Sequence, residues 1–193
     1  MRHFLALIIL SMFLVGCGGT RFMEPGAKID APPAGKALVN VHRPSTAYGG
    51  GQDLILWRDQ EIVGNTHGQD MFQVVVDPGK QVFHAKQLNV SVIKAELEAG
   101  KTYDIVVDCG PNFVPFQPGY RLWLNVIDAK SERRGDVLSW VAKAQILVLS
   151  DKEKADREKL QAKQLPGVQK YLADFVDGEK DSKSAKLVPA DGR

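Results

Sequence analysis

The feature that most constrains the fold is a series of short apolar runs between residues 36 and 150, each bounded by residues typical of turns. In the first run Ala37, Val39 and Val41 alternate with other side chains, and Pro44 follows. A period of two places alternate side chains on opposite faces of a β-strand. Because several short strands at this spacing are typical of sandwiches and barrels, we predict a mainly β domain, an antiparallel β-sandwich of about 7–9 strands.

Turn signals separate these predicted strands. Residues 58–60 divide two apolar runs and predict a hairpin, and residues 77–79 and 99–101 each contain a glycine that adopts φ > 0 easily. The run 120–127 has apolar residues on both faces, which is typical of a central strand. Residues 137–149 are predicted to form a short helix and then a closing strand.

The segment 151–177 is predicted to be helical. Ser150 and Glu153 have the spacing of a capping box, and Pro166-Gly167 is predicted to break the helix. Five apolar residues then recur on one helical face: Val168, Tyr171, Leu172, Phe175 and Val176. We expect this stripe to pack on the β-domain; a partner's groove or the membrane surface is the alternative. Residues 178–193 are polar and are predicted to be disordered.

The N-terminus is predicted to be an export signal. Residues 1–16 start with the basic Arg2 and continue as an apolar stretch from Phe4 to Val15. A helix of that stretch would span about 18 Å, well short of the ~30 Å hydrocarbon core, so a transmembrane span is not expected. Residues 17–35, rich in glycine and proline, are predicted to be a flexible tether.

Leu14-Val15-Gly16-Cys17 resembles the lipobox of bacterial lipoproteins at all four positions. The resemblance implies cleavage before Cys17, diacylglycerol on its sulfur, and a third acyl chain, commonly palmitate, on the new N-terminus. Two or three acyl chains make dissociation from a membrane slow. Gly18 rather than Asp follows the cysteine, which for a Gram-negative lipoprotein implies the outer membrane, facing the periplasm. The alternative is an ordinary signal peptide with a chance cysteine.

A second resemblance covers about residues 32–110. Residues 32–44, 59–85 and 97–107 share a pattern of strands, a Pro-Gly turn and an Ala-Gly-Lys-Thr-Tyr segment. This pattern is similar to an uncharacterised family of small bacterial lipoproteins and, more distantly, to PEGA-type surface β-domains. The shared motifs are turns, so the resemblance implies a β fold and no particular activity or site.

Few residues point to chemistry. With Cys17 lipidated, Cys109 has no partner for an intramolecular disulfide in the mature chain, and we favour a buried structural thiol over a reactive one. His42, His67 and His84 lack metal-ligand spacing, so we interpret them as surface or strand-edge residues. No serine lies in a nucleophile elbow. We therefore predict no catalytic, metal or cofactor site.

The segment 110–120, GPNFVPFQPGY, is unusual for a connection between strands. It carries Phe113, Phe116 and Tyr120 among three prolines. We favour a covering loop whose phenylalanines close the open end of the sandwich. The alternative is a partner-binding loop, because prolines lower the entropy cost of presenting aromatic side chains. In that case these three aromatic residues are the candidate contacts.

The charge balance argues against nucleic acid as a partner. The chain has 25 Lys+Arg and 23 Asp+Glu, a net charge of +2, which is no strong basic field. We predict a lipid-anchored cell-envelope protein, a non-catalytic interaction module that binds an envelope protein or peptidoglycan. The alternatives are a periplasmic ligand-binding or enzymatic domain and an accessory lipoprotein of a secretion assembly.

Overall fold

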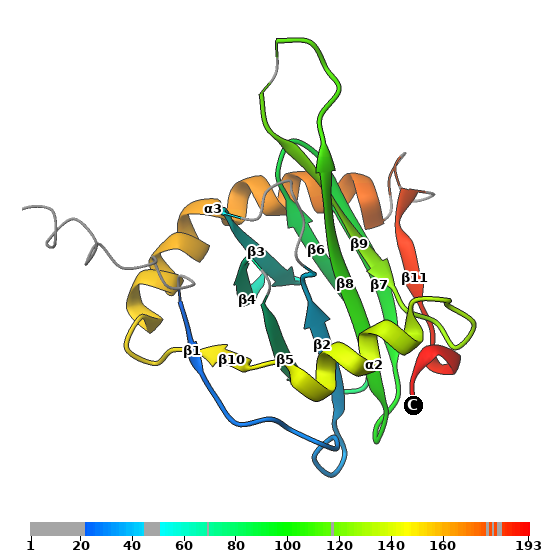
Figure 1. The fold of residues 1–193 in the computed structure, drawn as a ribbon. Helices are drawn as coiled ribbons and strands as arrows, with labels where there is room; N and C mark the ends of the chain where they lie inside the picture. The colour runs from blue at the N-terminus through cyan, green and yellow to red at the C-terminus, as the bar shows by residue number, and fades with distance from the viewer. Residues whose placement is uncertain are drawn as a thin grey trace, which may run out of the picture.

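The computed structural model describes residues 22–44, 51–68, 70–116, 118–176, 178, 180 and 183–193. The predicted signal peptide and the predicted lipidation site Cys17 lie outside these residues. Within them, eleven strands form a six-stranded and a five-stranded sheet, accompanied by helices (Figure 1). The predicted mainly β fold with a C-terminal helix is confirmed, but the predicted number of 7–9 strands is too low.

The six-stranded sheet has the order β1-β10-β5-β2-β8-β9. These strands are β1 (Met23–Pro25), β2 (Ala37–His42), β5 (Met71–Val76), β8 (Thr102–Pro111), β9 (Tyr120–Val126) and β10 (Ile146–Leu149). The five-stranded sheet has the order β11-β7-β6-β3-β4. These strands are β3 (Asp53–Arg58), β4 (Glu61–His67), β6 (Gly79–Lys86), β7 (Val90–Leu97) and β11 (Ala185–Leu187). The helices are α2 (Arg134–Lys143), α3 (Lys154–Val176) and the 3-10 turn η2 (Pro189–Asp191).

The sheets are mixed, whereas the prediction was antiparallel. β10 runs parallel to β5, β2 to β8, and β11 to β7. Only β1 and β11 lie outside residues 36–150, so the other nine strands fall inside the predicted β-domain. The predicted number of strands is exceeded because β1, before that domain, joins the six-stranded sheet, and β11, after it, joins the five-stranded sheet.

The two sheets share one apolar core. Val39 and Ile105 of the six-stranded sheet and Leu54 and Phe83 of the five-stranded sheet belong to the same cluster, and each is at most 1% exposed. Each sheet thus turns one face toward the other, and alternate side chains of its strands fill the space between them.

The predicted turns are present, but two of them do not make hairpins. β3 and β4 pair antiparallel across residues 58–60, as predicted. By contrast, Gly79 and Gly100, with φ of 115° and 78°, lie where the chain passes from β5 to β6 and from β7 to β8, which belong to different sheets. Turn chemistry permits a change of direction and does not select the next strand's partner.

β9 was predicted to be a central strand and is instead the last strand of its sheet. Its outer edge is bonded by side chains of β7 and of the turn that precedes β7. The Leu122 N–H donates to Asn89 Oδ1 at 2.9 Å, and the Leu124 N–H donates to Ser91 Oγ at 2.9 Å. The outward-facing Trp123 remains 43% exposed. The second apolar face of β9 is therefore a partly exposed surface rather than a second buried layer.

α3 is a continuous helix of 23 residues, so the predicted break at Pro166-Gly167 is wrong. Proline inside a helix costs about 3 kcal/mol because it lacks an N–H and crowds the preceding turn. Packing offsets this cost: Val168 is buried with Trp57 and Ile62 of the five-stranded sheet. The predicted docking of the apolar stripe on the β-domain is confirmed.

Ser150 and Glu153, predicted to cap this helix, bind the N-terminal strand segment. Glu153 Oε2 accepts the Phe22 N–H at 2.9 Å, and Ser150 Oγ donates to Glu24 Oε2 at 2.9 Å. Phe22 is 1% exposed, and β1 pairs antiparallel with β10. Residues 22–25 are therefore part of the fold rather than of the flexible tether predicted over 17–35.

The tail predicted to be disordered over 178–193 contains a folded segment. β11 pairs with β7, and Leu187 is 1% exposed. Arg193 exchanges two backbone hydrogen bonds with Thr102. The segment is polar on average, but it contains Leu187, an apolar side chain that fits the core. One buried side chain and pairing with a free sheet edge are enough to hold a short strand.

Candidate functional site

The connection between β8 and β9 is the most exposed apolar feature of the described residues. We call residues 112–119 the aromatic loop; Gln117 within it lies outside the described residues. Figure 1 shows that it projects beyond the rest of the molecule. Phe113 is 86%, Val114 50% and Phe116 105% exposed. The prediction that the phenylalanines cover the open end of the fold is therefore wrong.

The shape of the aromatic loop is set by its own backbone. Phe116 has φ of 60°, a left-handed conformation that is unfavourable for a bulky residue and costs about 1–3 kcal/mol. Pro115 and Pro118 each fix a φ angle. Gly119 has φ of 139° at the return into β9. Since its phenylalanines are not packed on the domain, the strained conformation is not explained by core burial.

Tyr120, the third aromatic residue singled out from the sequence, is separated from the other two. It is 6% exposed and pairs with Pro111 at the base of the aromatic loop. Burial raises the pKa of Tyr120, with the charge of Arg43 opposing the shift. Tyr120 thus supports the base of the loop, and Phe113 and Phe116 present its surface.

Arg43 lies beneath the same base and was not identified from the sequence. It is 2% exposed, and its Nη1 donates to the carbonyl oxygens of Gln52 and Thr66 at 2.8 Å. Burial raises the pKa of the nearby Cys109 thiol, again opposed by Arg43. Cys109 is half-buried against the main core, which fits a structural thiol rather than an activated one.

Two further exposed apolar side chains flank the aromatic loop. A Cβ atom at Gly119 would lie 2.8 Å from Cδ1 of Leu88, which is 41% exposed, so Leu88 packs beside the loop. A Cβ atom at Gly110 would lie 2.8 Å from Cζ3 of Trp123. Only one charged residue, Arg121, occurs between residues 109 and 127. This stretch of the chain is therefore apolar and almost uncharged.

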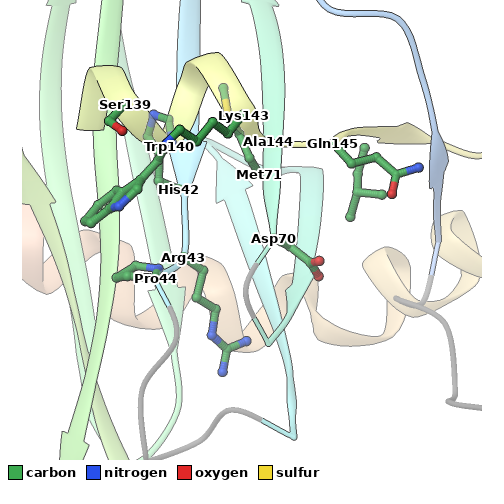
Figure 2. A pocket seen from close by; sticks show the side chains of 11 residues that line it. His42, Arg43, Pro44, Asp70, Met71, Ser139, Trp140, Lys143, Ala144 and Gln145 are labelled. Carbon is green, nitrogen blue, oxygen red and sulfur yellow. The ribbon is translucent and has the colours of Figure 1, made fainter. Parts of the chain in front are cut away.

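A cleft of about 460 Å³ lies beside α2, between that helix and the ends of β2 and β5 (Figure 2). His42, which lines it, is only 2% exposed, and its Nε2 lies 3.2 Å from Asp104 Oδ1. Arg43 also lines the cleft, and its guanidinium donates to the carbonyl oxygens of Gln52 and Thr66. The lining also includes the polar side chains of Asp70, Ser139, Lys143 and Gln145. His42 and Arg43, the two most deeply buried polar residues of the cleft, are thus engaged within the fold.

The buried carboxylate of Asp104 joins the C-terminal residue to the six-stranded sheet. Asn40 Nδ2 donates to Asp104 Oδ1 at 2.9 Å, and His42 and the Arg193 guanidinium bind the same carboxylate. Burial by itself would raise the pKa of Asp104, but the hydrogen bonds from His42 and Asn40 and the charge of Arg193 together hold that pKa below its usual range. Since the Asp104 carboxylate is paired with all three of these side chains, we interpret the cluster as structural.

The prediction of surface or strand-edge histidines is wrong for two of the three. His42 is 2% and His84 0% exposed, whereas His67 is partly exposed beside Asp53, with 3.1 Å between Nδ1 and Oδ1. His84 Nε2–H donates to the Asp59 carbonyl oxygen at 2.8 Å, and the Tyr171 hydroxyl donates to Nδ1 at 2.8 Å. Both ring nitrogens are used within the fold.

In the part of the chain that the structure describes, no three His, Cys, Asp or Glu side chains gather as metal ligands. No helix among the described residues is long and apolar enough to cross a membrane. No model of a known protein family matches the sequence, and no curated protein matches it. Because its phenylalanines are exposed, the aromatic loop is the site from which we argue function.

Proposed function

We propose that this protein is a lipid-anchored cell-envelope protein whose β-sandwich is a non-catalytic interaction module, with the aromatic loop as its contact element. One observation carries the proposal: Phe113 and Phe116 are 86% and 105% exposed. Burying such a side chain in a contact contributes about 1.5–3 kcal/mol, so exposed aromatic clusters favour binding.

Anchorage is proposed at Cys17, at the end of an apolar segment with the layout of an export signal. Diacylglycerol on its sulfur and an acyl chain on its nitrogen hold the domain at a membrane, which we propose to be the outer membrane on its periplasmic side. Envelope proteins and peptidoglycan are the partners within reach of a domain held there. An accessory role in a secretion assembly is a narrower form of the same function.

A ligand-binding or enzymatic function is the second candidate, and the cleft beside α2 is the observation that favours it. Ligand sites combine an apolar pocket with a few convergent polar groups. Here Nε2 of His42 and the guanidinium of Arg43 are already bonded within the fold, whereas the buried Nδ1 of His42 has no hydrogen-bond partner among the described residues. We therefore rank this candidate below the interaction module.

Photo-crosslinking in cells tests the contact. A diazirine amino acid in place of Val114 lies between the two phenylalanines, and one in place of Leu138, which is 42% exposed on α2, is the control. We expect adducts from position 114 that the Phe113→Ser/Phe116→Ser substitution removes, and none of those adducts from position 138.

The double substitution leaves the core intact, since neither phenylalanine is buried, so an unchanged thermal midpoint confirms folding. The mass of the purified protein reports whether acyl chains are present on Cys17. An unacylated product contradicts the proposed anchorage. Folded, acylated protein that gives no adduct from position 114 contradicts the proposed contact.

A further inference from the structure

We infer that the aromatic loop enters the lipid bilayer to which the protein is anchored. The inference rests on the proposed function, because it takes lipidation of Cys17 as its starting point, and it names the partner of the loop. The groups that enter are the side chains of Phe113, Val114 and Phe116, the three most exposed large apolar side chains of the described residues.

The composition of the loop fits hydrocarbon. Residues 110–120 contain no charged residue, although 25% of the chain is charged. A charged side chain at hydrocarbon depth is costly, and this segment has none to place there. A protein groove would also accept phenylalanine, but it gives no reason for the absence of charge along the whole projecting segment.

The prolines reduce the number of backbone N–H groups that would lack hydrogen-bond partners in a bilayer. A backbone N–H without a hydrogen-bond partner is unfavourable in hydrocarbon, so irregular backbone is normally kept at the interface. Pro115 and Pro118 within the aromatic loop have no N–H, which removes two such donors from the irregular segment, and Pro111 at the end of β8 removes a third beside it. The tip can therefore lower its side chains into the acyl region while the backbone stays at headgroup depth.

The strand below the loop carries side chains suited to the headgroup region. Arg121 and Trp123 are both exposed and lie on the same outward face of β9. Tryptophan is enriched at membrane interfaces, and arginine keeps its guanidinium at the phosphates while its stem lies along apolar surface. Leu88, packed beside Gly119, widens the apolar end of the molecule.

The anchor keeps the loop close to the bilayer. The described chain begins at Phe22, which is buried and whose N–H is bonded to Glu153. Four residues lie between Cys17 and Phe22, so the five residue steps span at most about 18 Å. Figure 1 shows β1 at the side of the molecule and the aromatic loop at one end, so a tilted domain can turn both toward one surface.

Tethering makes a shallow insertion sufficient. A second contact made by an anchored molecule occurs at a high effective concentration and needs little affinity of its own. Peptidoglycan fits the loop poorly, because glycan and peptide groups require hydrogen-bonding partners and the exposed side chains at positions 113, 114 and 116 offer none. The aromatic loop therefore binds lipid, and protein or peptidoglycan partners bind the remaining surface of the domain.

Depth-dependent quenching tests the inference. The mature, acylated protein with Phe116→Trp is reconstituted into vesicles of phosphatidylethanolamine and phosphatidylglycerol whose acyl chains carry bromine. The matched control is Leu138→Trp on α2, and the unsubstituted protein supplies the emission of Trp57, Trp123 and Trp140. We expect brominated lipid to quench the emission added at position 116 and to leave the emission added at position 138 unchanged.

The outcomes separate this inference from the proposed function. If the emission added at position 116 is not quenched while crosslinks from position 114 reach a protein, the bilayer inference is overturned and the interaction module stands. If crosslinks from position 114 reach lipid and the emission added at position 116 is quenched, the bilayer inference and the proposed anchorage are supported, and the proposed contact of the aromatic loop with an envelope partner is contradicted. A product without acyl chains overturns both.

Discussion

At the scale of single residues, His84 shows how a buried polar group holds two elements together. Its ring stacks on Trp57 with centroids 6.0 Å apart and meets the edge of Tyr171, so it lies between the five-stranded sheet and α3. Nε2 donates to the Asp59 carbonyl oxygen, which leaves Nδ1 as the acceptor for the Tyr171 hydroxyl. This arrangement requires a neutral imidazole, because a protonated Nδ1 cannot accept.

The first stability prediction follows from this requirement. Burial lowers the pKa of His84 from 6.5 to about 4. The unfolded chain therefore binds a proton at a pH where the folded protein does not. The contribution of His84 to the free energy of unfolding is complete above pH 6.5 and is lost as the pH falls toward 4, by on the order of 3 kcal/mol.

Urea denaturation of the natural protein and of His84→Gln at pH 7, 5.5 and 4.5 measures this contribution. We expect the difference in unfolding free energy between the two proteins to shrink as the pH falls, because the variant has no imidazole to titrate. The titration of other groups changes the unfolding free energy of both proteins by the same amount, so it cancels in the difference between them. A difference that stays constant over this range would show that His84 is not held neutral.

At the scale of elements, α3 shows packing overriding a local signal. Pro166 is a helix breaker by intrinsic preference, yet the helix runs through it from Lys154 to Val176. Val168 and Phe175 on the sheet-facing side are 3% and 8% exposed. The position of a helix boundary is decided by the whole packed face, and here Leu160, before the proline, packs against the same cluster as Val168, after it.

Val168→Ala is expected to lower the free energy of unfolding by about 2 kcal/mol, because two buried methyl groups are lost and a small cavity is left against Trp57 and Ile62. Lys170→Ala, at an exposed position of the same helix, is the control and should change stability by less than about 0.5 kcal/mol. Both are measured by chemical denaturation. Equal effects of the two substitutions would mean that α3 is not docked on the sheet.

At the scale of the whole molecule, the two ends of the described chain complete the two sheets. β1 occupies one edge of the six-stranded sheet and β11 one edge of the five-stranded sheet. The guanidinium of Arg193 reaches the buried carboxylate of Asp104 on the other sheet. Covered edges are protected from pairing with other chains, so these short terminal strands stabilise the domain and limit aggregation.

Leu187→Ala tests the contribution of the C-terminal strand. Leu187 is 1% exposed in the main core, so the substitution should lower the free energy of unfolding by about 2–5 kcal/mol. The neighbouring Val188 is 41% exposed, and Val188→Ala should have little effect. Thermal and chemical denaturation measure both. If Leu187→Ala is as stable as the natural protein, the segment 183–193 is not an integral part of the domain.

The candidate site could be predicted only in part. The sequence singles out Phe113, Phe116 and Tyr120 as aromatic residues in a proline-rich connection, but it does not separate the exposed pair from the buried tyrosine. Val114 lies between the same prolines and could have been named by the same argument. Arg43 carries no local signal, because its role depends on carbonyl groups of Gln52 and Thr66 that are brought to it by folding.

Local patterns in the sequence by themselves determined the hairpin at residues 58–60, the helix and strand within 137–149 and the apolar face of α3, because period and turn chemistry act over a few residues. Only the tertiary structure decided that the turns at 77–79 and 99–101 change sheets. It likewise decided that β9 is an edge strand, and that His84 is buried while Phe116 is exposed. Strand partners and burial depend on residues far apart in the chain, and no local pattern encodes which of them meet.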